Sequence, residues 1–338
     1  MNDTSGTRRT SAVTRLAALL ILIGIGGCDN VEWGGLDLSV MPPPPQAADA
    51  DVEVVGTTAQ LPEGPVLYYV RRDSAGAEVV PVGEVTEDGM APIATGEDPD
   101  AFGQRFISAF LREGAELTLY HRGRRAGTLI LEGGEVPAAG VCRRLPRGTG
   151  RLELSGDAGQ AVEFLAMART QAPEGRVMPG DELAPSRRMQ VMGPILAERA
   201  LRARQAQLPN WARAQRQTFP FPVSETRDPA FTATFLVDDE LRVGNDDVGY
   251  SLFIVYTPQA QSGYDTAYVA FTDYPTDGKA APRAIDFLDW DRDGSPELLL
   301  QVYGTNQAWF EAVGATEGQW SRLLQDRCDP GATVTDTL

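Results

Sequence analysis

Residues 289–297 form an acidic loop that constrains the fold of this chain more than any other feature of its sequence. The nine residues read Asp-Trp-Asp-Arg-Asp-Gly-Ser-Pro-Glu, with carboxylates at positions 1, 3, 5 and 9 and glycine at position 6. Alternating carboxylates around a glycine turn converge on one point, where they repel one another unless a cation lies between them. The spacing therefore predicts a metal site whose ligands are the side chains of Asp289, Asp291, Asp293 and Glu297 and the backbone carbonyl of Ser295.

The surroundings of the loop predict the metal and the local fold. Hard oxygen ligands favour Ca²⁺ over zinc or copper. Position 12 is Leu300 rather than the glutamate of an EF-hand, and the flanks 284–288 and 297–302 read as strands. With its Gly-Ser-Pro-Glu-Leu run at 294–298, the loop resembles those of integrin-α-type FG-GAP and VCBS repeats. Because the pattern occurs once, the resemblance implies one calcium-pinned hairpin rather than a complete propeller. The alternative is an acidic surface turn without metal.

The N-terminal residues 1–27 read as an export signal. Three arginines precede an apolar run over residues 16–26, which is too short to span a membrane as a helix. The run ends in Ile-Gly-Gly-Cys, which resembles the lipobox of bacterial lipoproteins. That resemblance implies cleavage after Gly27 and acylation of Cys28 by chains such as palmitate. It would anchor the protein in the bacterial cell envelope, facing the periplasm or the cell surface. The alternatives are a cleaved signal with a chance cysteine and an uncleaved anchor.

Composition divides the rest of the chain into a tether and two domains. Residues 28–50 contain four consecutive prolines, which favour an extended polyproline II spacer. A break rich in Gly, Pro and Ala at 132–140 separates residues 51–135, expected to be a small α+β domain, from residues 141–329. This second domain is expected to be mainly antiparallel β-sheet with a helical insertion. The predicted fold class is therefore β-rich α+β.

Hydrophobic periodicity predicts where the elements lie. Asp98 and Pro99 are expected to begin a helix whose Phe102, Phe106 and Phe110 form one buried face. Strands are expected at residues 66–70, 79–85, 117–120, 128–131, 151–154, 162–167, 231–237, 250–256, 268–271, 297–303 and 309–313.

Residues 191–217 are the most helical stretch, interrupted at Pro209. From residue 187 to 216 there are seven arginines and one acidic residue, whereas residues 225–329 hold 19 acidic and seven basic residues. The basic helix either contacts anionic lipid headgroups or packs against the acidic remainder of the same protein. Almost all basic residues are arginine, and Lys279 is the only lysine.

Charge and composition exclude several classes of protein. A formal net charge of −17 argues against nucleic-acid binding, which requires a basic surface. With one histidine, His121, and three cysteines, a zinc site of several Cys and His ligands is excluded as well. In an exported chain Cys142 and Cys328 are expected to form a disulfide, although reduced thiols or a pair too far apart stay open. A second acidic cluster, 238–240 with 245–247, lacks ligand spacing and is expected to be a solvated turn.

The motifs of common enzymes are absent from the sequence. It contains no Gly-x-Ser-x-Gly elbow, no P-loop and no dinucleotide fingerprint. The sequence therefore favours a lipid-anchored envelope protein with a structural calcium loop and a non-enzymatic binding or structural role. Its expected partners are the membrane, through Cys28, and an unidentified protein or glycan. The alternative is an envelope hydrolase in which calcium shapes a carboxylate site, because paired carboxylates leave no local signature.

Overall fold

A computed structural model describes residues 59–87, 89–137, 144–175, 183–223, 228–244, 248–259 and 263–326. These residues all belong to one compact unit, Val55–Leu338. The predicted lipidation at Cys28, the tether and the predicted disulfide between Cys142 and Cys328 lie outside the described residues. The described part is rich in β-structure, with few helices. None of its helices combines the length and the apolar character needed to cross a membrane.

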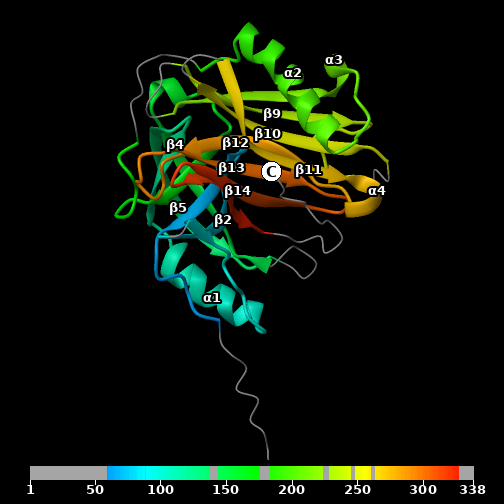
Figure 1. Cartoon of the computed structure of the whole chain (residues 1–338). Coiled ribbons are helices and arrows are strands. Elements are labelled where there is room, and N and C mark those ends of the chain that lie inside the picture. Colours follow the sequence, from blue (N-terminus) through cyan, green and yellow to red (C-terminus); the bar gives the residue numbers. More distant parts are fainter. Residues whose placement is uncertain are drawn as a thin grey trace, which may run out of the picture. The chain divides into compact units, whose positions relative to one another are not determined.

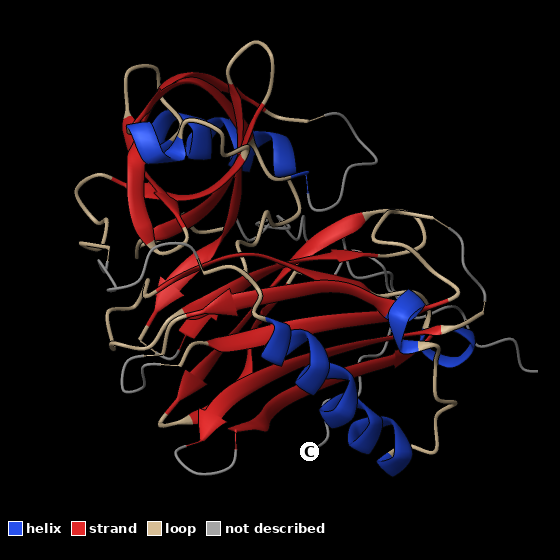
Figure 2. Ribbon diagram, turned by 90° about the horizontal axis from the view of Figure 1, so that it is seen from above, coloured by secondary structure: helices blue, strands red, loops and turns tan. Residues whose placement is uncertain are grey.

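The first half of the unit forms an antiparallel β-barrel (Figures 1 and 2). Its six strands follow one another in the order β1-β7-β4-β5-β6-β2, and pairing between β1 and β2 closes the ring. A short seventh strand, β3 (Gly89–Ala91), continues the sheet beyond β2. The barrel strands are β1 (Val66–Arg72), β2 (Ala77–Thr86), β4 (Glu116–His121), β5 (Arg124–Glu135), β6 (Arg147–Leu154) and β7 (Glu163–Ala168).

Helix α1 (Pro99–Phe110) lies across the ring of strands (Figure 2) and contributes to the barrel core. The Asp98 side chain accepts a hydrogen bond from the backbone N–H of Ala101 at 2.9 Å, so the predicted N-cap is confirmed. Phe102 and Phe106, one helical turn apart, are buried among the inward-facing residues of β1, β4 and β5. The predicted aromatic stripe is thus part of a hydrophobic core.

The second half forms two four-stranded antiparallel sheets. The sheet β11-β10-β9-β8 comprises β8 (Gln215–Phe221), β9 (Ala230–Val237), β10 (Tyr250–Gln259) and β11 (Gly263–Asp273). The sheet β12-β13-β14-β15 comprises β12 (Ala281–Leu288), β13 (Glu297–Tyr303), β14 (Ala308–Thr316) and β15 (Gln319–Gln325). Short helices α3 (Trp211–Ala214) and α4 (Tyr274–Asp277) connect neighbouring elements.

These parts stack in layers, with α2 (Arg187–Ala203) over the sheet β8–β11, then the sheet β12–β15, then the barrel (Figure 1). In β13, Leu298 and Leu300 pack towards the sheet β8–β11, whereas Leu299 packs towards the barrel. Because both faces of β13 are covered, three consecutive residues, Leu298–Leu300, are apolar where a strand with one exposed face would alternate.

The predicted helix over 191–217 differs from the structure at both ends. Helix α2 begins earlier, because the Ser186 hydroxyl caps it by accepting a hydrogen bond from the N–H of Met189 at 3.2 Å. Gln215–Phe221 is the strand β8 instead of helix, because it pairs with β9 along its length and buries Phe221 between the sheets. Tertiary pairing overrides the helical composition at this point.

The barrel contains strands from both sides of the domain boundary that was expected at residues 132–140. β6 pairs with β5, and β7 pairs with β1 and β4, so the ring takes strands from before and after that boundary. A common core then joins the barrel to the sheet β12–β15, with Tyr69 of β1 against Phe310 of β14 at a ring-centroid distance of 5.1 Å.

Candidate metal centre

The acidic loop joins β12 to β13, so the predicted strand–loop–strand arrangement is confirmed. Leu288 at the end of β12 pairs directly with Glu297 at the start of β13. The loop is held between these two residues, and Gly294 adopts φ 98°, a conformation that favours glycine. Trp290 is 2% exposed and packs into the core between the barrel and the sheet β12–β15. The loop is therefore attached to the core by its second residue.

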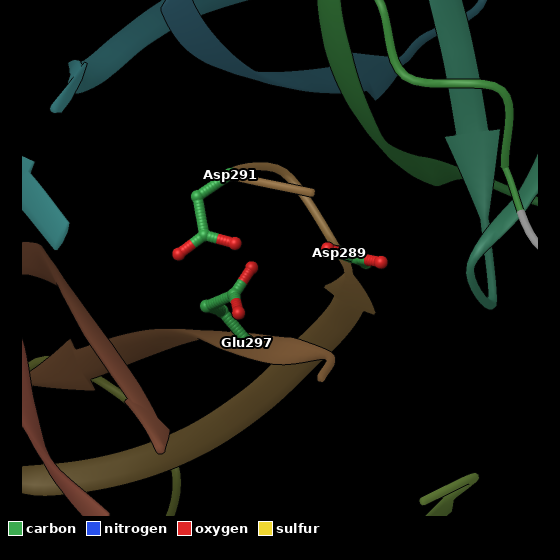
Figure 3. A group of neighbouring side chains, drawn as sticks. All are labelled: Asp289, Asp291 and Glu297. Atoms are coloured by element: carbon green, nitrogen blue, oxygen red, sulfur yellow. The ribbon is translucent and has the colours of Figure 1, made fainter. Parts of the chain in front are cut away.

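Three of the predicted ligands come together in this loop (Figure 3). Asp289, Asp291 and Glu297 each offer a carboxylate oxygen, and these oxygens all lie within 4.8 Å of one another. Glu297 is 1% exposed, whereas the two aspartates are half-buried. The group could therefore hold a metal ion, with the glutamate on the protein side and the aspartates towards solvent.

Backbone hydrogen bonds position the carboxylates. Glu297 accepts one from the N–H of Trp290 at 2.9 Å, which ties the buried glutamate to the start of the loop. Asp291 accepts one from the N–H of Asp293 at 3.0 Å, and Asp289 accepts one from the N–H of Gly294 at 3.3 Å. The loop thus orients its side chains through its own backbone.

Burial and mutual repulsion make the group unfavourable without a cation. The pKa of Glu297 is raised to about 9, chiefly by burial. The negative charges of Asp291 and Asp289 also raise it, whereas the hydrogen bond from the N–H of Trp290 lowers it. Burial also raises the pKa of Asp291, with further contributions from Asp293 and Asp289. A bound cation would relieve both effects, because it compensates for lost hydration and separates like charges.

The remaining predicted ligands are placed differently. The side chain of Asp293 is exposed and accepts a hydrogen bond from the N–H of Ser295 at 2.6 Å, and it lies outside the three-residue group. Ligation by Asp293 and by the carbonyl of Ser295 stays a prediction.

The second acidic cluster, residues 238–240 with 245–247, was predicted to be a solvated turn, but Asp239 is buried. This residue is 5% exposed and forms an ion pair with the buried Lys279, so the prediction was wrong there. Asn245, Asp246 and Asp247 of the same cluster lie outside the described residues. The spacing of the acidic residues gave no sign of this pairing, because Lys279 lies 40 residues further along the chain. The only available signal was that Lys279 is the one lysine.

Two other carboxylates that sequence reasoning missed, the half-buried Glu163 and the buried Asp286, join the barrel to the sheet β12–β15. Glu163 of β7 binds Arg283 of β12 through both carboxylate oxygens, at 2.8 Å and 2.6 Å. Asp286 of β12 lies beside the β4–β5 turn, with one oxygen 3.5 Å from Nδ1 of His121. Each is a single acidic residue in a strand, so the sequence does not distinguish it from an exposed one.

Comparison of the chain with protein-family models, with curated proteins and with solved structures finds no match.

Proposed function

We propose that Asp289, Asp291 and Glu297 bind a calcium ion that stabilises the fold of a non-enzymatic, lipid-anchored envelope protein. The observation that carries the calcium site is the convergence of three carboxylates, one of them buried, within 4.8 Å. Four acidic side chains in one short loop repel one another, and a divalent cation between them removes this electrostatic cost.

The chemistry of the donors favours calcium among the divalent cations. The loop contains neither histidine nor cysteine, the usual ligands of zinc and copper. Calcium takes roughly six to eight oxygens in flexible geometry, so carboxylates, a backbone carbonyl and water can share its shell. Asp293 and the carbonyl of Ser295 would complete the set that the three clustered residues begin.

Bound calcium would act on the junction between the barrel and the sheet β12–β15. Trp290 belongs to the same hydrophobic core as barrel residues such as Leu67 and Tyr69. Arg292, also in the loop, donates a hydrogen bond to the carbonyl oxygen of Gln171, which follows β7, at 2.7 Å. An ion that fixes the loop therefore also fixes these two contacts to the barrel, which supports a structural role.

The burial of Glu297 counts against the alternative of a carboxylate hydrolase. A glutamic acid with a raised pKa can serve as a general acid, as in many glycosidases. Its carboxyl group must then reach the substrate, and Glu297 is 1% exposed beneath the loop. A ligand role towards an ion held inside the loop fits that position better.

The membrane anchor rests on the N-terminal sequence. The apolar run and the Ile-Gly-Gly-Cys motif support acylation of Cys28, and the proline-rich residues that follow support a spacer between the membrane and the folded unit. Mass spectrometry of the protein extracted from membranes would test this, since cleavage after Gly27 removes residues 1–27 and acylation adds lipid to Cys28. An N-terminus that starts elsewhere and carries no lipid would contradict it.

Thermal unfolding tests the metal site. Calcium should raise the unfolding midpoint of the purified protein and a chelator should lower it, because the ion binds only the folded loop. The double variant Asp289→Ala/Asp291→Ala should lose this response, whereas Asp157→Ala, which removes an exposed aspartate outside the loop, should keep it. The same response in all three proteins would contradict the proposal, as would no response in the unaltered one. Titration with magnesium in place of calcium tests the choice of ion.

A further inference from the structure

Lys279 is the only lysine of the chain, and its side chain is 0% exposed. It forms an ion pair with Asp239, whose side chain is also 0% exposed. Elsewhere the chain uses arginine for such contacts, for example in the pair between Arg283 and Glu163. The only lysine side chain of the sequence therefore occupies a position that excludes water, in direct contact with a carboxyl group.

The pair lies where the two four-stranded sheets are joined. Asp239 follows β9, and Lys279 lies between α4 and β12. The hydroxyl of Tyr274 donates a hydrogen bond to Oδ2 of Asp239 at 2.6 Å, and Nζ of Lys279 donates to Oδ1. Ala280, next to the lysine, is 1% exposed. Amine, carboxyl and hydroxyl groups thus meet in an almost dry environment.

We propose that Lys279 and Asp239 become joined by an intramolecular amide bond. The ammonium group first gives up a proton to the carboxylate, and the neutral Nζ then attacks Cγ of Asp239. A C–N bond forms and the C–Oδ2 bond breaks, and Oδ2 leaves as water with two of the three ammonium protons. The reaction needs no oxidant, cofactor or further reactant.

Tyr274 is the residue placed to transfer the proton. Its hydroxyl contacts Oδ2, the oxygen that leaves, so it can donate its proton there and regain one from the amine. The fold supplies the proximity, because it holds the two reacting groups in contact. Burial favours the product, since the amide replaces two charges that are costly to keep away from water.

The choice of lysine follows from this chemistry. A guanidinium group keeps its proton under physiological conditions and is a poor nucleophile, whereas an amine can be deprotonated and attack a carbonyl carbon. Arginine could supply the positive charge of an ion pair, but it could not form the bond. The bond would link residues 40 positions apart and fasten the β9–β10 connection to the segment before β12.

Mass spectrometry of the denatured full chain tests the proposal. Unaltered protein and the variant Lys279→Arg are compared, so that any N-terminal processing cancels. The expected mass difference is that of the substitution plus one water molecule, because the unaltered chain has lost a water. Masses that differ by the substitution alone would overturn the proposal and leave an ordinary ion pair.

Cleavage after arginine locates the bond. Asp239 falls in the peptide 228–242 and Lys279 in the peptide 243–283. Tandem mass spectrometry should find them as one species with two amino termini, at Asp228 and Val243. Water loss with no such species, for example by cyclisation at Asp277–Gly278, would overturn the assignment. Tyr274→Phe should reduce the linked fraction; an unchanged fraction would exclude Tyr274 as the proton donor.

Discussion

The backbone N–H of Arg122 points at both carboxylate oxygens of Asp286, at 2.9 Å and 2.8 Å. Arg122 forms the tip of the β4–β5 turn in the barrel, with φ 51°, and Asp286 belongs to β12 in the neighbouring sheet. Asp286 also accepts a hydrogen bond from the N–H of Phe287 at 2.8 Å and is 1% exposed. A buried carboxylate therefore fixes a barrel turn to the edge of the second sheet.

Replacing Asp286 with alanine should lower the free energy of unfolding by about 1–3 kcal/mol, because it removes a buried carboxylate that accepts hydrogen bonds from the N–H groups of Arg122 and Phe287. Asp286→Asn, which keeps one acceptor oxygen, should cost less. Urea titration of both variants measures the difference, with the exposed Asp157→Ala as control. Equal stability of Asp286→Ala and the control would show that the contact contributes nothing.

Replacing Glu297 with glutamine should weaken the response to calcium. Glutamine has nearly the same shape but no charge, so it removes an anionic ligand and also the cost of a buried ionisable group beside Asp289 and Asp291. In chelator the variant should be at least as stable as the unaltered protein, and with calcium it should gain less. Glu311→Gln is the matched control, since Glu311 is a 3% exposed glutamate outside the loop. Midpoint shifts with calcium that match in both variants would refute the metal role of Glu297.

Acid should weaken the contact between Glu163 and Arg283. Burial alone would raise the pKa of Glu163, but hydrogen bonds from Arg283 and Tyr69 outweigh it and hold the pKa below the ordinary 4.5. A lowered carboxyl pKa stabilises the fold above the unfolded-state value, and this contribution is lost as the pH falls through the folded-state value. The stability gap between the unaltered protein and Glu163→Gln should therefore narrow below pH 4.5. Urea midpoints at neutral and acid pH measure it; a gap independent of pH would contradict the prediction.

Replacing Gly103 with alanine should destabilise the barrel by about 1–3 kcal/mol, although alanine favours helices. A Cβ atom at this position of α1 would lie 2.4 Å from Cγ2 of Val136. The additional change Val136→Ala should restore part of the loss by making room. Thermal unfolding of the single and double variants checks this, and additive losses would show that the two residues do not clash.

Elements specified by adjacent residues were predictable from the sequence. Asp98 and Pro99 mark the start of α1 through a cap and a fixed φ, and the turn between β4 and β5 follows from two apolar runs around a polar one. The meeting of Asp289, Asp291 and Glu297 was predictable for the same reason, since one short loop contains all three.

Features that depend on distant partners were not predictable. Gln215–Phe221 is a strand because β9 lies beside it, and Asp239 is buried because Lys279 reaches it. The closed barrel is a further case, since its order places β7 between β1 and β4. Local composition contains no information on such pairings, whose specificity arises from packing across the fold.

The position of β7 also determines when the barrel can be completed while the chain is synthesised from its N-terminus. The hairpin of β1 and β2 and the run of β4, β5 and β6 pair with neighbours already present, but β1 and β4 have no common partner until Glu163–Ala168 appears. Until then two strand edges stay open to other chains. Nascent chains that stop before β7 are therefore the aggregation-prone species, and a chaperone that shields β1 and β4 would matter most during that interval.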